Sequence, residues 1–220
     1  MDKYSILKQY YGHSAFRAGQ EELIDSILSG RDALCVMPTG GGKSLCYQIP
    51  ALLLPGITLV VSPLISLMKD QVAALKSAGV PAAYINSSLT SEQIRTVYAR
   101  TRKGAYKLIY VAPERLETNS FLLLMQEMDV SFLAVDEAHC ISQWGQDFRP
   151  SYLGIVDFIN ALPRRPIVAA YTATATKQVQ SDILRLLQLQ SPYRIVTGFD
   201  RPNLYFDVRR PKNKFSALAA

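Results

Sequence analysis

Apolar residues form short continuous runs along the chain, and segments with helical spacing lie between most of these runs. The runs of strand length cover residues 33–37, 57–62, 81–85, 107–112, 131–136, 166–171 and 194–197. Helical patterns cover residues 14–29, 45–54, 65–78, 90–102, 151–160 and 175–188. Because strands buried on both faces read as continuous apolar runs, this alternation predicts an α/β fold with a mostly parallel central sheet and helices on both faces.

The two ends of the pattern indicate the limits of the domain. The first predicted helix would have its N-cap at Ser14 and would stop at Gly30. Residues 204–208 read as one last strand after a turn, and residues 209–220 read as the start of a linker. We therefore expect one domain over residues 1–208.

The segment with the most specific chemistry is a glycine-rich loop that reads Met-Pro-Thr-Gly-Gly-Gly-Lys-Ser and ends at Ser44. Consecutive glycines between a strand and a helix let several backbone N–H groups point into one cavity, which suits a polyphosphate. Lys43 would reach the β- and γ-phosphates, and the Ser44 hydroxyl would bind Mg²⁺. The residues predicted to bind the phosphates are Pro38, Thr39, Gly40, Gly41, Gly42, Lys43 and Ser44. Met37 stands where the strict pattern has its first glycine, and a plain turn is the alternative.

A second signal supports this interpretation. The apolar run 131–136 ends in two adjacent carboxylates, Asp136 and Glu137. Asp136 can hold Mg²⁺ through water, since this ion retains most of its waters and takes one or two carboxylates. Glu137 can orient and deprotonate an attacking water. The loop and the acid pair both follow strands of a parallel sheet and can meet in space, so together they indicate hydrolysis of a nucleoside triphosphate.

Composition narrows the class of protein further. The chain has 220 residues, 49% of them apolar, which suits one α/β domain with a substantial core. A net charge of +6 and a pI near 9.2 fit a polyanionic partner without requiring one. The three cysteines, Cys35, Cys46 and Cys140, show no paired spacing and fit buried thiols in a reducing compartment. The sequence shows no signal peptide and no apolar run of membrane length, so we expect a cytoplasmic protein without a membrane partner.

Seven segments occur in the order that is typical of one family of motor proteins. They cover residues 16–20, 37–44, 61–71, 112–116, 136–139, 141–150 and 172–175, and residues 136–139 read Asp-Glu-Ala-His. On these segments the chain resembles the RecQ family of ATP-dependent DNA helicases, within superfamily 2, and specifically their first RecA-like motor domain. The resemblance covers nearly all of the chain. Helicases of this superfamily commonly lack the first glycine of the phosphate loop, which accounts for Met37.

The resemblance implies ATP as the nucleotide and an adenine-reading motif within the N-terminal helical residues 1–30. Arg17 and Gln20 match that motif: Gln can present a donor and an acceptor to an adenine edge, and Arg can stack or hydrogen-bond. His13 lies where many relatives have an aromatic residue that stacks on the base, with a surface-loop histidine as the alternative. By the same resemblance, His139 would join the catalytic residues and couple the nucleotide state to a DNA-sensing loop.

The resemblance also implies binding of single-stranded or partly duplex DNA. Trp144, Phe148 and Arg149 match an aromatic-rich loop that senses DNA, and bases would stack on its rings; the alternative is that both rings belong to the core. Gln146 stands in this loop where many members carry histidine, which puts its coupling to hydrolysis in doubt. The residues that would line the DNA path or link hydrolysis to strand separation are Ser62, Pro63, Leu64, Arg115, Thr172 and Thr174.

Three functions remain open from the sequence. The first is a motor domain that couples ATP hydrolysis to 3′-to-5′ unwinding in its parent protein, a polarity implied by the resemblance alone. The second is a nucleotide- and DNA-binding module with negligible turnover, because the second RecA-like domain with its arginine finger lies outside these residues, as do the family's zinc-binding domains. The third is a small-molecule phosphotransferase, which leaves the aromatic-rich loop without a role. We expect part of a helicase that works with the second RecA-like domain and is nucleoid-associated if bacterial.

Overall fold

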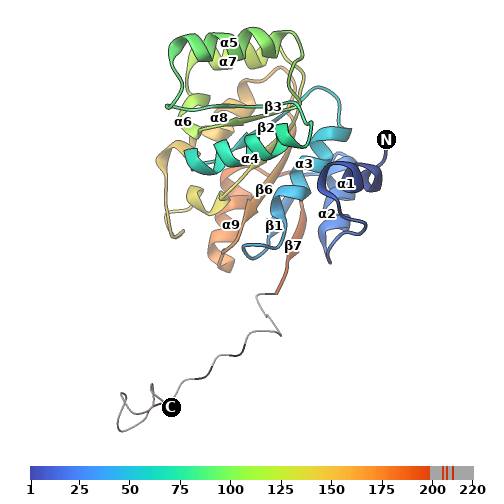
Figure 1. Cartoon of the computed structure of the whole chain (residues 1–220). Helices are drawn as coiled ribbons and strands as arrows, with labels where there is room; N and C mark the ends of the chain where they lie inside the picture. The colour runs from blue at the N-terminus through green and yellow to red at the C-terminus, as the bar shows by residue number, and fades with distance from the viewer. Residues whose placement is uncertain (199–204, 206, 208–209, 211–220) are drawn as a thin grey trace.

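A parallel β-sheet forms the centre of the computed structural model, which describes residues 1–198, 205, 207 and 210. The strands lie in the order β3-β4-β2-β5-β6-β1-β7, and neighbouring strands are parallel (Figure 1). Their bounds are Ala33–Val36 (β1), Ile57–Val61 (β2), Ala82–Ile85 (β3), Leu108–Val111 (β4), Val130–Val135 (β5), Ile167–Thr172 (β6) and Tyr193–Val196 (β7). The predicted parallel α/β fold is therefore confirmed.

Alternate side chains of each strand point to opposite faces of the sheet, and helices cover both faces. In β5, Phe132 and Ala134 face one layer, whereas Leu133 and Val135 face the other. The first layer consists of α2 (Gln20–Leu28), α3 (Lys43–Leu53) and α4 (Ile65–Ser77), with α1 (Lys3–Tyr11) packed on α2 and α3. The second layer consists of α5 (Ser91–Arg102), α6 (Pro113–Leu116), α7 (Asn119–Gln126), α8 (Gly154–Ala161) and α9 (Lys177–Leu186), with the 3₁₀ turns η1 (Ala138–Ile141) and η2 (Pro150–Tyr152).

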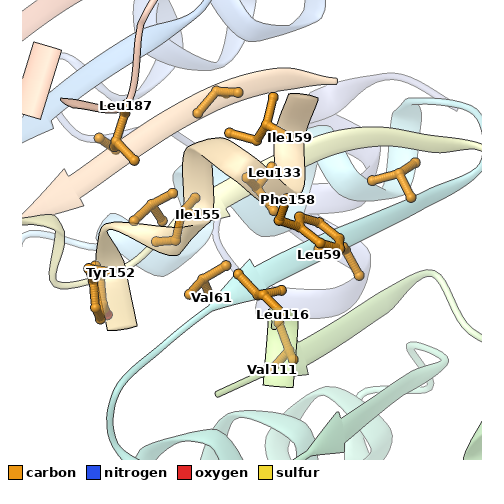
Figure 2. Packing of buried hydrophobic residues seen from close by; sticks show 14 of the residues in the cluster. Leu59, Val61, Val111, Leu116, Leu133, Tyr152, Ile155, Phe158, Ile159 and Leu187 are labelled. Carbon is orange, nitrogen blue, oxygen red and sulfur yellow. The ribbon is translucent and has the colours of Figure 1, made fainter. Parts of the chain in front are cut away.

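The second layer anchors the strand end that carries the acid pair. Helix α8 directs Phe158 toward the sheet, as Figure 2 shows, and Phe158 stacks on Phe121 of α7 with ring centroids 5.9 Å apart. Burial of each such side chain stabilises the fold by roughly 1.5–3 kcal/mol. Tyr152, buried in the same cluster, donates a hydrogen bond to the backbone carbonyl of Asp136 at 2.8 Å. The core thus fixes the backbone at the carboxyl end of β5.

The N-terminal helix differs from its prediction. Helix α2 begins at Gln20 rather than near Ser14, because Gly19 has a φ angle of 80° and a right-handed helix does not continue through that conformation. The helix ends at Leu28, just before Gly30. Helix α1 lies within residues 1–30, which were expected to be helical, whereas α6 and α7 have no counterpart among the predicted helices.

The predicted C-terminal elements lie largely outside the described residues. Of the predicted strand 204–208 and the predicted linker 209–220, the structure describes only residues 205, 207 and 210. The domain boundary at residue 208 therefore stays a prediction. Within the described part of the chain, no helix has both the length and the apolar composition needed to cross a membrane.

All strands place their carboxyl ends at one edge of the sheet. Val36 of β1 pairs with Thr172 of β6, and Val61 of β2 pairs with Val135 of β5. The loops that follow these four strands therefore meet at this edge, where parallel sheets bind ligands. Because β6 lies between β1 and β5, Thr172 stands between the phosphate loop and the acid pair.

Candidate functional site

The glycine-rich loop leads directly into the N-terminus of α3, with Gly42 as the N-cap residue. Gly40 and Gly42 have φ angles of 79° and 84°, a backbone conformation that favours glycine. Gly41 is also constrained, because a Cβ there would lie 2.9 Å from the carbonyl oxygen of Pro38. The Lys43 ammonium donates to the carbonyl oxygen of Met37 at 3.0 Å, so it lies across the mouth of the loop.

Two residues of the N-terminal segment hold the loop from outside. The Gln20 amide donates to the carbonyl oxygens of Gly41 and Gly42, both at 3.2 Å, and its own oxygen accepts from the backbone N–H of Arg17 at 2.9 Å. The Arg17 guanidinium donates to the carbonyl oxygen of Gly40. A Cβ at Gly42 would lie 2.3 Å from the Gln20 amide nitrogen. The predicted adenine-reading motif and the glycine-rich loop are therefore packed as one unit.

A cavity of about 440 Å³ joins the loop to the acid pair. Among its lining residues are most of those predicted to bind ATP: His13, Arg17, Gln20, Thr39, Gly40, Gly42, Lys43, Ser44, Asp136 and Glu137. Pro38 and Gly41 shape the loop without being among the residues that line the cavity. The sequence prediction missed four lining residues: Ala15, Leu45, Leu67 and Gln71. The last two lie four positions apart on α4, a spacing that places them on one helix face.

The acid pair has two different electrostatic environments. The Asp136 side chain is buried, and this burial, with the neighbouring charge of Glu137, raises its pKa to about 6. The Glu137 carboxylate lies 3.2 Å from Nδ1 of His139, and this hydrogen bond lowers the pKa of Glu137. Glu137 has a φ angle of 47°, uncommon for a residue with a side chain. The turn after β5 thus separates the two carboxylates into a buried one and a half-exposed one.

A hydrogen-bonded chain leads from the acid pair to β6. Nδ1 of His139 lies 2.9 Å from the hydroxyl of Thr172, which donates to the carbonyl oxygen of Thr174 at 3.0 Å. Because the hydroxyl gives its only hydrogen to Thr174, it accepts from His139, so Nδ1 carries the proton. Hydrogen bonds to the sulfur of Cys140 and to Glu137 raise the pKa of His139 to about 10.

Replacing Asp136 with asparagine is expected to stabilise the nucleotide-free domain at neutral pH, by about 1–3 kcal/mol in the free energy of unfolding. The raised pKa of Asp136 means that the folded domain holds this proton more tightly than the unfolded chain does. The wild-type carboxylate therefore lowers stability as the pH rises from about 4 to about 6, and its full cost persists at higher pH. Denaturant titrations in EDTA at about pH 4.5 and about pH 8 measure this effect. Equal stability gains for D136N at both pH values would contradict it.

The aromatic-rich loop, residues 142–149, lies beside the acid pair; Ser142 is buried, and residues 143–149 are partly or fully exposed. Trp144 keeps 74% of its surface exposed, so the alternative that its ring belongs to the core is wrong. A Cβ at Gly145 would lie 2.2 Å from the carbonyl oxygen of His139, which shows how closely the loop passes the acid-pair segment. The Arg149 guanidinium donates to the carbonyl oxygen of Pro63 at 3.1 Å and so ties the loop to the segment after β2.

The other predicted DNA-path residues differ in exposure. Leu64 and Thr174 are exposed, whereas the Ser62 side chain is buried and its hydroxyl has no hydrogen-bond partner within the described residues. Arg115 is half-buried on α6, and Gln146 is exposed beside Trp144. The exposed members of the predicted DNA-contacting set are thus Leu64, Trp144, Gln146 and Thr174.

A glycine-rich loop at a helix N-terminus that faces an acid pair on a parallel sheet defines a nucleotide-binding domain of the P-loop class. A family profile described as DEAD/DEAH box helicase matches residues 17–182. The chain belongs to this DEAD/DEAH box helicase family. Within it, the chain is the first RecA-like domain of a RecQ-type helicase.

Two bacterial relatives support this placement. The chain is 51% identical to the ATP-dependent DNA helicase RecQ of Bacillus subtilis, over 96% of this chain and 36% of the relative. It is 52% identical to the ATP-dependent DNA helicase RecQ of Haemophilus influenzae, over 92% of this chain and 32% of the relative. The chain therefore spans about a third of the length of these curated relatives.

Solved structures share the fold. The DUF1998 helicase MrfA bound to DNA matches with a TM-score of 0.72 at 15% identity, over 90% of this chain and 29% of that chain. The yeast DEAD-box splicing factor Prp28 matches with a TM-score of 0.68 at 19% identity, over 90% of this chain and 48% of that chain. These likenesses confirm the RecA-like architecture.

Proposed function

We propose that the chain is the ATP- and DNA-binding first motor domain of a DNA helicase, which couples ATP hydrolysis to unwinding in the 3′-to-5′ direction. One observation carries the proposal: a single cavity is lined by Lys43 and Ser44, which follow β1, and by Asp136 and Glu137, which follow β5. These two strands are not neighbours in the sheet. The names of the relatives as ATP-dependent DNA helicases support the same reaction.

The proposed nucleotide site assigns one task to each group. The N–H groups of the loop and the Lys43 ammonium bind the phosphates, and the partial positive charge at the N-terminus of α3 adds to their attraction. Titration of the chain with a fluorescent ATP analogue tests this site, and saturable binding that ADP competes for is the expected result. Failure of the analogue to bind in the presence of Mg²⁺ would refute the site.

The residues around Ser44 and Asp136 fit a magnesium ion. Their donor set is a hydroxyl and a carboxylate, hard oxygen ligands of the kind that Mg²⁺ prefers. Within the described residues, the Asp136 carboxylate accepts a hydrogen bond from the backbone N–H of Glu137 and has no cationic partner within ion-pair distance. We infer that Ser44 and Asp136 hold Mg²⁺, which when bound neutralises charge on the phosphates.

Glu137 is the proposed general base. The hydrogen bond from His139 lowers the pKa of Glu137, so its carboxylate is ionised at neutral pH and able to accept a proton from water. His139 in turn contacts Thr172. We propose that this contact couples the state of the nucleotide to β6 and to the exposed Thr174.

Turnover by the 220 residues alone is expected to be negligible. An arginine finger is worth about 10³–10⁵ in rate in other nucleoside triphosphatases, and we propose that a second RecA-like domain of the parent protein supplies it. Steady-state ATPase assays with and without single-stranded DNA test this expectation. DNA-stimulated turnover at several events per second from this chain would contradict it.

Replacing Trp144 with alanine is expected to weaken binding of single-stranded DNA by roughly 5- to 150-fold, because stacking of a base on an aromatic ring is worth about 1–3 kcal/mol. Binding of the ATP analogue should not change. Anisotropy of a labelled oligothymidylate measures the effect, and L123A is the control, since Leu123 is an exposed apolar residue on α7. Unchanged DNA affinity in W144A would favour the small-molecule phosphotransferase instead.

A further inference from the structure

A buried carboxylate of α9 holds the base of the aromatic-rich loop. Asp182 is 7% exposed, and it accepts a hydrogen bond from the Ser142 hydroxyl at 2.7 Å. Ser142 is fully buried and is the first residue of the loop. The Asp182 carboxylate also pairs with the guanidinium of Arg185 at 3.0 Å, which compensates its charge at the surface. The hydrogen bond from Ser142 lowers the pKa of Asp182, so the carboxylate is ionised at neutral pH.

The same hydroxyl is linked to the aromatic residue itself. The backbone N–H of Trp144 donates to the Ser142 hydroxyl oxygen at 3.2 Å. Because that hydroxyl gives its hydrogen to Asp182, its lone pairs are oriented to accept from Trp144. The backbone N–H of Gly145 donates to the Ser142 carbonyl at 2.9 Å and closes a tight turn. The orientation of the Trp144 backbone therefore depends on a carboxylate that lies 40 residues away in the sequence.

Packing alone does not fix Trp144. The residue borders two hollows, one of about 370 Å³ that Phe148 and Leu186 also line, and one of about 400 Å³ that Thr176 and Val179 also line. With open space on both sides, the ring has few contacts that would define its position. The hydrogen bonds of the Ser142 hydroxyl are then the contacts that fix the position of the loop.

We propose that Asp182 is a positioning residue for DNA binding, which holds Trp144 in its exposed position at the surface through the Ser142 hydroxyl. The proposal rests on the DNA-binding function proposed above and adds a residue outside the recognised helicase segments. Helix α9 begins at Lys177, three residues after Thr174, so the helix that carries Asp182 follows closely on the segment of Thr174.

The test uses a property of the chain itself: Trp144 is its only tryptophan, so fluorescence excited at wavelengths that tyrosine does not absorb reports on this loop alone. In D182A we expect stronger acrylamide quenching and lower anisotropy of Trp144 than in the wild type. Affinity for oligothymidylate should fall roughly 2- to 10-fold, the change that loss of one ordinary hydrogen bond predicts. D182N retains an acceptor oxygen and should restore part of both signals, whereas affinity for the ATP analogue should stay at the wild-type value in both variants.

Further variants separate positioning from general destabilisation. S142A should reproduce the fluorescence change of D182A, and the double variant should add nothing to either single change. S181A is the control, since Ser181 is the exposed neighbour on the same helix and bonds only within α9. Wild-type quenching in both D182A and S142A would overturn the proposal. If the wild type binds no oligothymidylate, the proposed function fails, while the quenching comparison still decides whether Asp182 positions the loop.

Discussion

Replacing Glu137 with glutamine is expected to lower the rate of ATP hydrolysis by roughly 10²–10⁴-fold in the parent helicase, the usual contribution of a general base. Glutamine has nearly the same shape but does not accept a proton from water at neutral pH. Because the Glu137 side chain pairs with His139 and the substitution leaves the loop contacts of Lys43 and Gln20 in place, the affinity for ATP should change little. Single-turnover hydrolysis together with analogue binding separates the two quantities.

The matched control for Glu137 is another glutamate with a surface role. Glu127 forms an exposed ion pair with Arg102 at 2.7 Å, so E127Q changes the same charge without touching the cavity. Its turnover should equal that of the wild type. If E137Q retained more than about a tenth of wild-type turnover, Glu137 would not be the base, because general bases contribute at least about 10².

Replacing Lys43 with alanine is expected to weaken binding of the ATP analogue by roughly 10- to 100-fold, since hydrogen bonds to charged groups are worth about 1.5–3 kcal/mol. The substitution removes the ammonium and its contact with the Met37 carbonyl, while the glycine backbone of the loop remains. Fluorescence titration with the analogue measures the loss. K69A is the control because Lys69 is an exposed lysine on α4, the helix that forms another wall of the cavity. Equal affinity in K43A and the wild type would remove Lys43 from the phosphate site.

The strands could be predicted because burial requires apolar residues in them. For the same reason, the glycine-rich loop and the acid pair could be predicted to meet at one edge of the sheet. Strand β5 is buried along its whole length and is apolar from Phe132 to Val135, and the first carboxylate after it marks the edge of the sheet. The same reasoning locates the glycine-rich loop after β1. Parallel pairing then brings both to one edge without any further information.

Features that depend on tertiary contacts could not be predicted. The helix at residues 14–29 was extended too far toward the N-terminus because its apolar spacing does not show that Gly19 takes a positive φ angle. Residues 1–30 were expected to be helical, but the bounds of α1 could not be assigned, because it buries the adjacent pair Ile6 and Leu7 against α2 and α3 and such a pair gives no clear helical period. The contact between Ser142 and Asp182 joins two ordinary polar residues, and only the docking of α9 makes it visible.

The engagement of Gln20 with the phosphate loop constrains any redesign of nucleotide choice. Its amide nitrogen already donates hydrogen bonds to the carbonyl oxygens of Gly41 and Gly42, and its oxygen already accepts one from the backbone N–H of Arg17. A substitution at Gln20, predicted to read adenine, would also release two carbonyls of the glycine-rich loop. With the proposed roles of Gln20 and the loop, base preference and triphosphate affinity would not be separable traits, and an engineered change of base would require the glycine loop to be rebuilt with it.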